Sequence, residues 1–301
     1  MISRKKREFT VVGIGEILWD LLPEGKQLGG APANFAYHAH CFGAKGEIVS
    51  AIGDDVLGRE IRDKVKDMNL GINYIELDAK HPTGTVSVKL DSQGTPDYTI
   101  HQKVAWDYIP WNHSISRLAK KTEAVCFGSL AQRSTVSQHT IKKFLMNTNP
   151  DCLRIFDANL RQKYHSIDTI KQSLKLATVL KCNESELKDI AGYCHITGNE
   201  ERVVKQLITT YNLLLVAVTR GKRGSVLYTP KLKSVISAPS VKVVDTVGAG
   251  DAFTAGICMG ILYKQPLEIL HQKATKLSAF ICTQKGAMPL YPAKVKQELF
   301  I

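Results

Sequence analysis

The sequence lacks several features that would mark a membrane, secreted or zinc-binding protein. Its longest apolar run covers only Leu213–Val218, whereas a helix needs roughly 20 apolar residues to cross a bilayer. No apolar stretch follows the charges near the N-terminus, so no secretory signal is expected. The seven cysteines are odd in number and form no C-x-x-C pair, which argues against a disulfide framework and a zinc knuckle. We therefore expect a cytoplasmic protein with reduced thiols that enters no membrane.

Two common nucleotide-binding motifs are also missing. Gly13–Gly15 reads GIG, but no third glycine opens a helix after it, as a dinucleotide-binding fingerprint requires. The segment Glu16–Pro23 is expected to continue as extended chain instead. The P-loop pattern G-x-x-x-x-G-K-[ST] occurs nowhere in the chain. Any nucleotide must therefore be held by another arrangement.

The charge is strongly positive but dispersed. The formal net charge of +12 would suit an anionic partner, either a nucleic acid or a small phosphorylated ligand. Only Arg4–Arg7 forms a basic block, and a block at a terminus is commonly a solvated tail. Because no basic stripe is interleaved with aromatic residues, we expect no binding to nucleic acid.

The pattern of apolar residues predicts an α/β protein. With 301 residues and 44% hydrophobic content, the chain can bury a large core. Helical and strand-like segments alternate along it, which is typical of a mostly parallel sheet covered by helices. The expected strands are 9–15, 46–52, 124–128, 153–157, 178–181 and 213–219, and the expected helices include 32–42, 56–68, 249–262 and 267–283.

A β-hairpin interrupts this alternation. From Thr83 to Ile100 polar and apolar residues alternate, with turn residues at 92–94. A hairpin inserted into a βα sequence is a candidate lid over a site. Ligands of parallel sheets bind along the rim formed by the carboxyl ends of the strands, so polar residues just after strands are the candidates for function.

The segment Val244–Phe253 reads VDTVGAGDAF and leads into an expected helix. A helix N-terminus carries unpaired N–H groups and partial positive charge, and glycines let an anion approach the backbone closely. Gly248 and Gly250 would thus help to form an anion hole. Asp251 at its edge would repel phosphate, so a catalytic base best explains its presence. Ordinary capping of the helix is the alternative.

A second glycine-rich segment, Leu28–Ala36, also runs into an expected helix. Gly29 and Gly30 permit unusual backbone conformations, and Asn34 offers both donors and an acceptor, as polyol recognition needs. Asp20 just upstream could accept hydrogen bonds from two neighbouring hydroxyls. The alternative is a turn and a capped helix, with Asp20 in solvent.

Together the two segments and the candidate lid resemble the ribokinase-like (pfkB) family of carbohydrate kinases, and within it the bacterial-type fructokinases. The resemblance covers nearly the whole chain. It implies a single domain, residues 1–301, with a three-layer α/β/α fold, a mostly parallel central sheet and a small β-hairpin lid built from about 16–30 and 82–104. The supporting stretches are 13–20, GGAPANFA at 29–36, TGTVSV at 83–88, VAWD at 104–107, FGSLAQRS at 127–134, DANLR at 157–161 and DTVGAGD at 245–251.

The resemblance implies transfer of the γ-phosphoryl group of ATP to a sugar hydroxyl, with D-fructose 6-phosphate as the expected product. Asp251 would accept the hydroxyl proton. The backbone amides of Ala249, Gly250 and Asp251, after Gly248, would hold the developing charge. Because the proton leaves late in a loose transition state, an Asp with an ordinary pKa could serve.

The resemblance also implies sites for the nucleotide and for cations. Asn183 and Glu186 match an N-x-x-E element that acts on magnesium and phosphates, Glu186 through water. Thr219, Gly221 and Gly224 belong to a loop that would meet ATP. Asp245 and Gly286, with Ile281 and Gln284, correspond to a monovalent-cation site, expected for K⁺. The alternatives are an ordinary helix start at 183–186 and a plain hairpin turn at 218–226.

For the sugar, the resemblance suggests a set of contacts that converges from several segments. These are Asp20, Gly29, Gly30 and Asn34, with Asn159, Arg161 and Arg133 as further candidates. Either arginine could instead be an ion-paired structural residue. Trp106 is expected in the core at the base of the hairpin rather than as a stacking platform.

The lid would close over the sugar and exclude water, which protects ATP from hydrolysis, and it could also form a homodimer contact. Two alternatives stay open. The substrate could be another sugar or sugar acid, such as ribose or 2-keto-3-deoxygluconate. The fold could also serve as a non-catalytic sensor, although the presence of Asp251, Gly248 and Gly250 argues against it.

Overall fold

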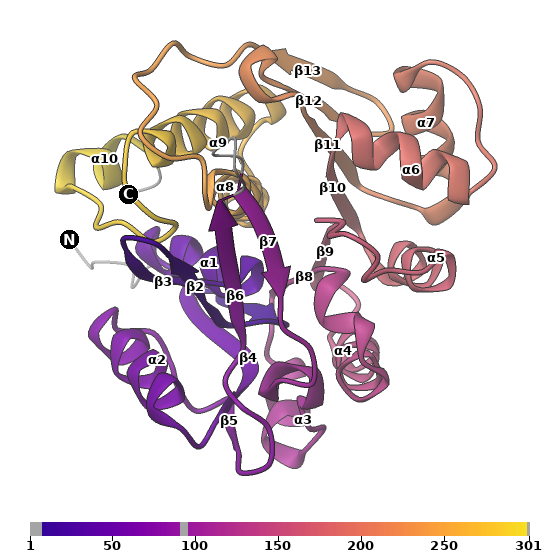
Figure 1. Ribbon diagram of the computed structural model, residues 1–301. Coiled ribbons are helices and arrows are strands. Elements are labelled where there is room, and N and C mark those ends of the chain that lie inside the picture. The colour runs from indigo at the N-terminus through magenta and orange to yellow at the C-terminus, as the bar shows by residue number, and fades with distance from the viewer. Residues whose placement is uncertain (1–7, 91–95, 300–301) are drawn as a thin grey trace, which may run out of the picture.

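A central β-sheet runs through the computed structural model, which describes residues 8–90 and 96–299 (Figure 1). Its strands are β1 (Thr10–Ile14), β4 (Lys45–Gly53), β5 (Ile75–Asp78), β8 (Ala124–Phe127), β9 (Leu153–Asp157), β10 (Val179–Asn183), β11 (Leu215–Thr219), β12 (Ser225–Tyr228) and β13 (Lys233–Ile236). They lie in the order β13-β12-β11-β10-β9-β8-β1-β4-β5. From β11 to β5 all neighbours are parallel, while β12 and β13 are antiparallel. The mostly parallel sheet predicted from the sequence is confirmed.

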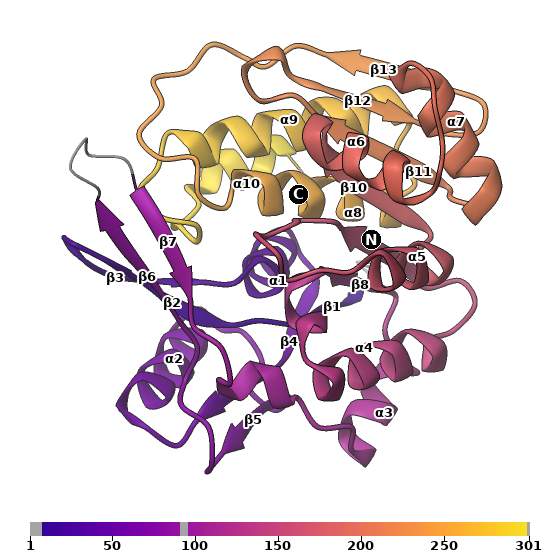
Figure 2. The same cartoon turned by 45° about the vertical axis from the view of Figure 1, so that its right-hand side comes forward.

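Helices cover both faces of this sheet and complete three layers. One face carries α1 (Ala31–Cys41), α2 (Val56–Asp67), α8 (Ala249–Leu262), α9 (Leu267–Cys282) and α10 (Ala293–Leu299). The other carries α3 (His113–Ala119), α4 (Thr135–Asn147), α5 (Ile167–Leu176), α6 (Glu184–Tyr193) and α7 (Glu200–Tyr211). Short 3₁₀ turns lie at η1 (Ala105–Tyr108), η2 (Leu130–Arg133) and η3 (Gly221–Arg223). Figures 1 and 2 show the two helical layers on either side of the strands.

The strands are apolar on both faces because both are covered. Val11 packs in the core with α1 and α8, whereas the next residue, Val12, packs in the core on the opposite face. Both side chains are fully buried. Strands of this kind read as continuous apolar runs rather than as alternating patterns, which is why the sequence locates them well. Within the described ranges no helix is long and apolar enough to span a membrane.

A second, four-stranded sheet contains the predicted hairpin. Its strands are β2 (Leu18–Leu22), β3 (Gly25–Gly29), β6 (Thr85–Leu90) and β7 (Pro96–Ile100), in the order β3-β2-β6-β7. The hairpin of β6 and β7 joins the hairpin of β2 and β3 through parallel pairing of β2 with β6. Figure 2 shows this small sheet at the side of the molecule near α2. The turn predicted at 92–94 and the basic block at 4–7 lie outside the described residues.

Two tryptophans hold the small sheet in place. Trp19 of β2 is buried, and its Nε1 donates a hydrogen bond of 3.0 Å to the carbonyl of Leu57 in α2. Trp106, at the foot of β7, is fully buried in the main core, as expected from the sequence. The small sheet therefore stands on packed apolar side chains while its strands reach over the rim of the central sheet.

The sheet order brings five segments together along that rim. Because β1, β8, β9, β10 and β11 are parallel neighbours, the residues that follow their carboxyl ends lie side by side. These are Gly15 and Glu16, Gly128 to Arg133, Ala158 to Arg161, Asn183 to Glu186, and Thr219 to Gly224.

Candidate active site

The N-terminus of α8 has an open, anion-binding geometry. Gly248 takes a left-handed conformation with φ 78°, and a Cβ there would lie 2.7 Å from Cα of Ala287. The residue must therefore be glycine. Among the described residues no acceptor pairs with the amides of Gly250 and Asp251. The amide of Ala249 instead donates to the carbonyl of Thr246 at 3.3 Å, because the turn at Gly248 folds it back. Two amides without an acceptor in the described part of the chain, those of Gly250 and Asp251, are therefore left to bind an anion, rather than the three that the sequence led us to expect.

Asp251 stands beside these amides. Its Oδ2 accepts a hydrogen bond of 2.7 Å from Nδ2 of Asn34, in the other glycine-rich segment. Burial, together with the charge of Asp157, raises the pKa of Asp251 to about 6, against the lowering effects of Asn34, Lys181 and Arg161. The sequence led us to expect an ordinary pKa for Asp251. That expectation is wrong because the carboxyl is buried, which disfavours its charged form.

A buried polar network that the sequence did not reveal lies beneath α8. Nζ of Lys181 is 2.9 Å from Oδ1 of Asp157, and Thr254 of α8 donates to the other oxygen at 2.8 Å. Burial disfavours the charged amine, but Asp157, Glu186 and Asp251 together raise the pKa of Lys181, so it stays cationic. A Cβ on Gly250 would lie 3.2 Å from this ammonium group. A fixed positive charge thus supports the anion hole from below.

The glycine pair fits tightly against two acidic residues. A Cβ on Gly29 would lie 2.5 Å from Oδ2 of Asp20, and a Cβ on Gly30 would overlap the carbonyl of Glu16. Gly30 also has φ 111° and begins α1. Burial raises the pKa of Asp20 to about 6, with Arg161 lowering it and Asp245 raising it. Asp20, Gly29, Gly30 and Asn34 are thus brought together as the sequence predicted.

Glu16 is a member of this cluster whose role the sequence did not indicate. It follows β1, is only 2% exposed, and its Oε2 has no hydrogen-bond partner in the described structure. Oδ1 of Asn34 is likewise buried without a partner. Buried polar atoms normally find partners, so these two oxygens are candidates for hydrogen bonds to a bound polar molecule.

Of the two residues predicted after β9, Arg161 reaches the cluster electrostatically. Its charge lowers the pKa values of Glu16, Asp20 and Asp251. Arg161 itself is exposed. Asn159 takes a left-handed conformation with φ 39°, and the carbonyl of Ala158 accepts a hydrogen bond of 2.9 Å from Ser129. The loop is held by Ser129 and, through the amide of Leu160, by Glu186.

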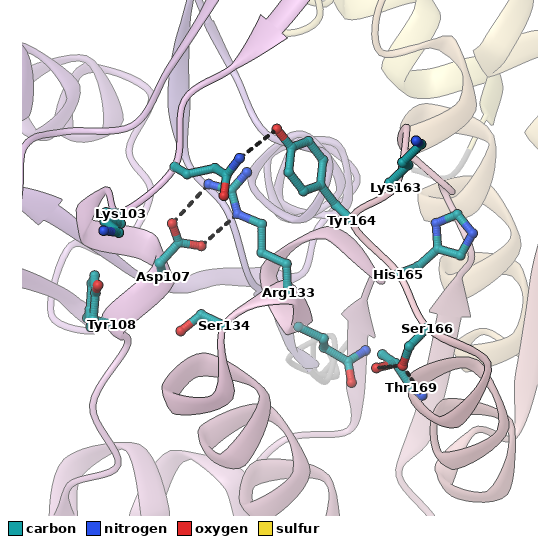
Figure 3. A pocket seen from close by; sticks show the side chains of 12 residues that line it. Lys103, Asp107, Tyr108, Arg133, Ser134, Lys163, Tyr164, His165, Ser166 and Thr169 are labelled. Atoms are coloured by element: carbon teal, nitrogen blue, oxygen red, sulfur yellow. Dashed lines mark hydrogen bonds and ion pairs between the residues drawn. The ribbon is translucent and has the colours of Figure 1, made fainter.

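Arg133 is held in an ion pair, the structural alternative that the sequence left open. Its Nε and Nη2 donate to the two carboxylate oxygens of Asp107 at 2.8 and 2.9 Å, as Figure 3 shows. The guanidinium also lies 4.0 Å from the ring centre of Trp106 and 4.8 Å from that of Tyr164. The ion-paired alternative is thus correct. Arg133, Asp107 and Tyr164 line a cavity of about 370 Å³, and its lining does not include Asp20, Asn34 or Asp251.

Asn183 and Glu186 form the N-terminus of α6. The Asn183 side chain accepts from the amide of Glu186 at 2.9 Å, and Glu186 accepts from the amide of Asn183 at 2.8 Å. The second oxygen of Glu186 accepts from the amide of Leu160 at 3.0 Å. Both carboxylate oxygens thus hold the backbone, and the helix-start alternative describes the local structure. Their remaining lone pairs could still accept from metal-bound water.

No group of three or more His, Cys, Asp or Glu side chains gathers into a metal site within residues 8–90 and 96–299. A magnesium ion at this rim would therefore take most of its ligands from phosphates and water, as Mg²⁺ commonly does. The donor set fits outer-shell binding by Glu186 and does not fit a cage of protein ligands.

Thr219 ends β11 directly beside Asn183 of β10. The loop after it closes an antiparallel hairpin between β11 and β12, so the plain-hairpin alternative is confirmed as the fold of this segment. Gly221 has φ 54° with open space beside it, whereas Gly224 has φ 92° and packs against the carbonyl of Ile236. The open face at Gly221 leaves room for a ligand, while Gly224 shapes the turn.

Asp245 organises the loop before α8. Its Oδ1 accepts from the amide of Val247 at 3.0 Å and its Oδ2 from the amide of Gly286 at 3.1 Å. Gly286 lies next to the side chain of Gln27 in β3, so this loop also meets the small sheet. Both carboxylate oxygens are engaged with amides, and any cation here would depend mainly on carbonyl oxygens.

Comparison with known proteins agrees with this geometry. Residues 24–294 match the model of the pfkB family carbohydrate kinases. The chain belongs to this family. An uncharacterized sugar kinase of Pyrococcus horikoshii is 31% identical over 304 residues, which cover 94% of this chain and 93% of that protein. A fructokinase of Klebsiella pneumoniae is 29% identical, covering 93% of this chain and 95% of that protein.

Solved structures give the same result. Fructokinase from Vibrio cholerae, in a form with fructose, ADP and calcium bound, has a TM-score of 0.79 and 25% identity, covering 98% of this chain and 99% of that one. The P. horikoshii protein in complex with ATP has a TM-score of 0.75 and 27% identity, covering 92% and 94%. The chain is therefore an enzyme, a sugar kinase with the ribokinase-like fold that the sequence predicted.

Proposed function

We propose that this sugar kinase transfers the γ-phosphoryl group of Mg-ATP to D-fructose and forms D-fructose 6-phosphate. Support comes from the fructokinases among the relatives. The single observation that supports the mechanism is the hydrogen bond of 2.7 Å from Asn34 to Asp251, since it joins an amide able to bind a sugar hydroxyl to the proposed base. The proposal includes a cytoplasmic location, where ATP is available.

In the proposed mechanism, the sugar lies between the glycine pair and the start of α8. Asp20 and Asn34 hold its hydroxyls, and the reacting hydroxyl faces Asp251. The hydroxyl oxygen attacks the γ-phosphorus, the bond from that phosphorus to the β,γ-bridging oxygen breaks, and the hydroxyl proton passes to Asp251. With its pKa raised to about 6, Asp251 is ionised at neutral pH and is a better base than an ordinary aspartate.

The negative charge on the transferring phosphoryl group would be stabilised by backbone amides and a lysine that are already in position. The amides of Gly250 and Asp251 have no other acceptor among the described residues, and Lys181 adds a fixed cation below them. Such preorganised donors act most strongly where water is excluded. The small sheet, as a lid, would supply that exclusion. We also propose that the lid could mediate a homodimer.

The nucleotide would lie along the carboxyl ends of β10 and β11, beside Thr219 and the open face of Gly221. A bound magnesium ion would supply neutralisation of the phosphate charge. Glu186 would orient its water shell from the start of α6. A monovalent cation, if used, would sit near Asp245 and Gly286 and stiffen the loop that leads to Gly248.

A panel of sugars tests the substrate assignment. Coupled ADP release is measured with D-fructose, D-ribose, D-glucose and 2-keto-3-deoxygluconate at equal ATP. We expect the highest kcat/KM with fructose. A higher value for ribose or for the sugar acid would reject fructose as the substrate while leaving the kinase assignment intact.

A further inference from the structure

Glu16 is the one buried carboxyl in the sugar cluster that the mechanism above does not use. It sits at the carboxyl end of β1, where the chain leaves the central sheet and enters the lid strand β2. Its side chain is 2% exposed, and Oε2 has no partner within the described residues. A buried carboxyl with an unpaired oxygen is costly to keep, so a ligand that pairs with it would explain its presence.

The backbone around Glu16 joins it to both known parts of the site. Its carbonyl packs directly against Gly30, which therefore cannot carry a side chain. The carbonyl of Gly30 accepts from the amide of Asn34 at 2.9 Å, and Asn34 in turn donates to Asp251. Glu16, the glycine pair, Asn34 and the base thus form one continuous wall.

Charged groups from three other elements face the Glu16 carboxyl. Asp251 comes from α8, Arg161 from the loop after β9, and Arg133 from η2. Arg133 is already paired with Asp107, and Asp251 is paired with Asn34. Within the described residues Oε2 of Glu16 makes no hydrogen bond to any of them, which leaves it to pair with a molecule held among them.

We propose that Glu16 is a further substrate-binding residue, whose Oε2 hydrogen-bonds directly to a hydroxyl group of the sugar. This inference rests on the assignment as a sugar kinase and not on fructose in particular. The unpaired Oδ1 of Asn34 provides a complementary acceptor on the same wall. The sugar would thereby meet a donor and an acceptor next to the base, which fixes its orientation as well as its affinity.

Glu16 and Asp251 differ in protonation state near neutral pH, so one can donate a hydrogen bond while the other accepts a proton. Burial and Asp251 raise the pKa of Glu16 to about 7, against the lowering effects of its own backbone amide, Arg161 and Arg133. The pKa of Asp251 is about 6. Between these values Asp251 is ionised and accepts a proton, while Glu16 is still protonated and donates. Carboxyl pairs with separated pKa values serve as acid and base in this way.

Two substitutions test the contact. Glu16→Ala removes the hydrogen bond, and we expect KM for the sugar to rise about three- to tenfold, as loss of one hydrogen bond implies. KM for ATP should stay unchanged. Glu16→Gln keeps a neutral donor of the same shape, so its KM at pH 6.5 should be within about twofold of the wild type. Glu16→Gln should also remove the fall in kcat/KM that we expect for the wild type above pH 7.

Deoxy sugars identify the contact itself. Analogues of the best substrate in the panel, each lacking one hydroxyl, are assayed with the wild type and with Glu16→Ala. We expect one analogue to lose about as much affinity with the wild type as Glu16→Ala does with the parent sugar. The same analogue should lose no more with Glu16→Ala, because the hydrogen bond is already absent.

Glu47→Gln serves as the matched control. Glu47 is 1% exposed and also has an unpaired Oε2, but it lies at the start of β4 and pairs with Lys45 at 2.9 Å, away from the sugar cluster. We expect it to change thermal stability without changing KM. An unchanged KM for the sugar with Glu16→Ala, or deoxy effects that persist undiminished in Glu16→Ala, would overturn the proposal. If the wild type phosphorylated no sugar, the kinase assignment itself would fail instead.

Discussion

Asn34 and Asp251 are joined by a hydrogen bond of 2.7 Å although 217 positions separate them in the chain. The bond connects the start of α1 to the start of α8, which pack side by side on the same face of the sheet. The glycine pair proposed to bind the sugar and the proposed anion hole are thereby held as one unit. A change in either segment should therefore affect both sugar binding and the chemistry of the base.

Replacing Asn34 with Ala tests this connection through pH. The hydrogen bond from Asn34 lowers the pKa of Asp251, so its loss should raise that pKa. Since Asp251 must be ionised to act, kcat/KM of the wild type should rise with pH through about 6, and the variant should need a higher pH. The pH profile of kcat/KM measures the shift. A variant whose acidic limb coincides with that of the wild type would show that the bond does not tune the base.

Replacing Gly248 with Ala tests the geometry of the anion hole. An alanine would adopt the left-handed backbone at a cost of about 1–2 kcal/mol, and its Cβ would press on Ala287. The turn must then shift and misplace the amides of Gly250 and Asp251. We expect kcat to fall about 10²-fold, since removing one such donor costs about 10² to 10³. Gly192→Ala in α6, where a Cβ meets open space, is the control and should keep full activity.

Lys181 should matter both for stability and for catalysis, and two variants separate the effects. Lys181→Met leaves the buried carboxylate of Asp157 without its partner and should lower the free energy of unfolding by about 3–5 kcal/mol. The double variant Lys181→Met with Asp157→Asn removes both charges and should recover much of that loss. Because the cation below Gly250 is still missing, kcat of the double variant should stay low. Recovery of full kcat together with stability would limit Lys181 to a structural role.

The raised pKa values of the site carboxyls should also appear in stability. Glu16 keeps its proton in the folded state up to about pH 7, whereas its reference pKa is 4.5. Its contribution is therefore fully present below about pH 4.5 and is lost as pH rises through 7, by roughly 3 kcal/mol in total. Urea unfolding of the ligand-free protein at pH 5 and 7.5 measures this. The decrease should be smaller in Glu16→Gln, and an equal decrease would contradict the assigned pKa.

Most of the framework could be predicted from the sequence because it depends on local patterns. Buried parallel strands are continuous apolar runs, and glycines before a helix mark an open N-terminus. Gly29, Gly30, Asn34 and Asp251 belong to such segments, and the structure brings them together. Their convergence could not come from spacing alone, since it depends on the sheet order that places β1 between β8 and β4 and on the packing of α1 against α8.

The residues that the sequence missed have no local signal. Lys181 lies within a strand, where a lysine in the sequence alone suggests an exposed position. Only the strand register shows that it lies opposite Asp157 and close to Gly250. The ion pair of Arg133 with Asp107, 26 positions away, likewise has no local signal. The raised pKa values of Glu16 and Asp251 follow from burial, which one sequence does not specify. Only Glu16 had a signal in the sequence: an acidic residue directly after a buried strand is a candidate for the ligand-binding rim.

The most direct test of the account is the turnover of Asp251→Asn. ADP release is measured with saturating fructose and ATP for the wild type and the variant, with sugar binding followed by calorimetry in parallel. We predict that the variant still binds fructose and that its kcat falls at least about 10²- to 10⁴-fold, the usual range for a lost general base. A variant that binds fructose and turns over at a near-normal rate would contradict the central claim.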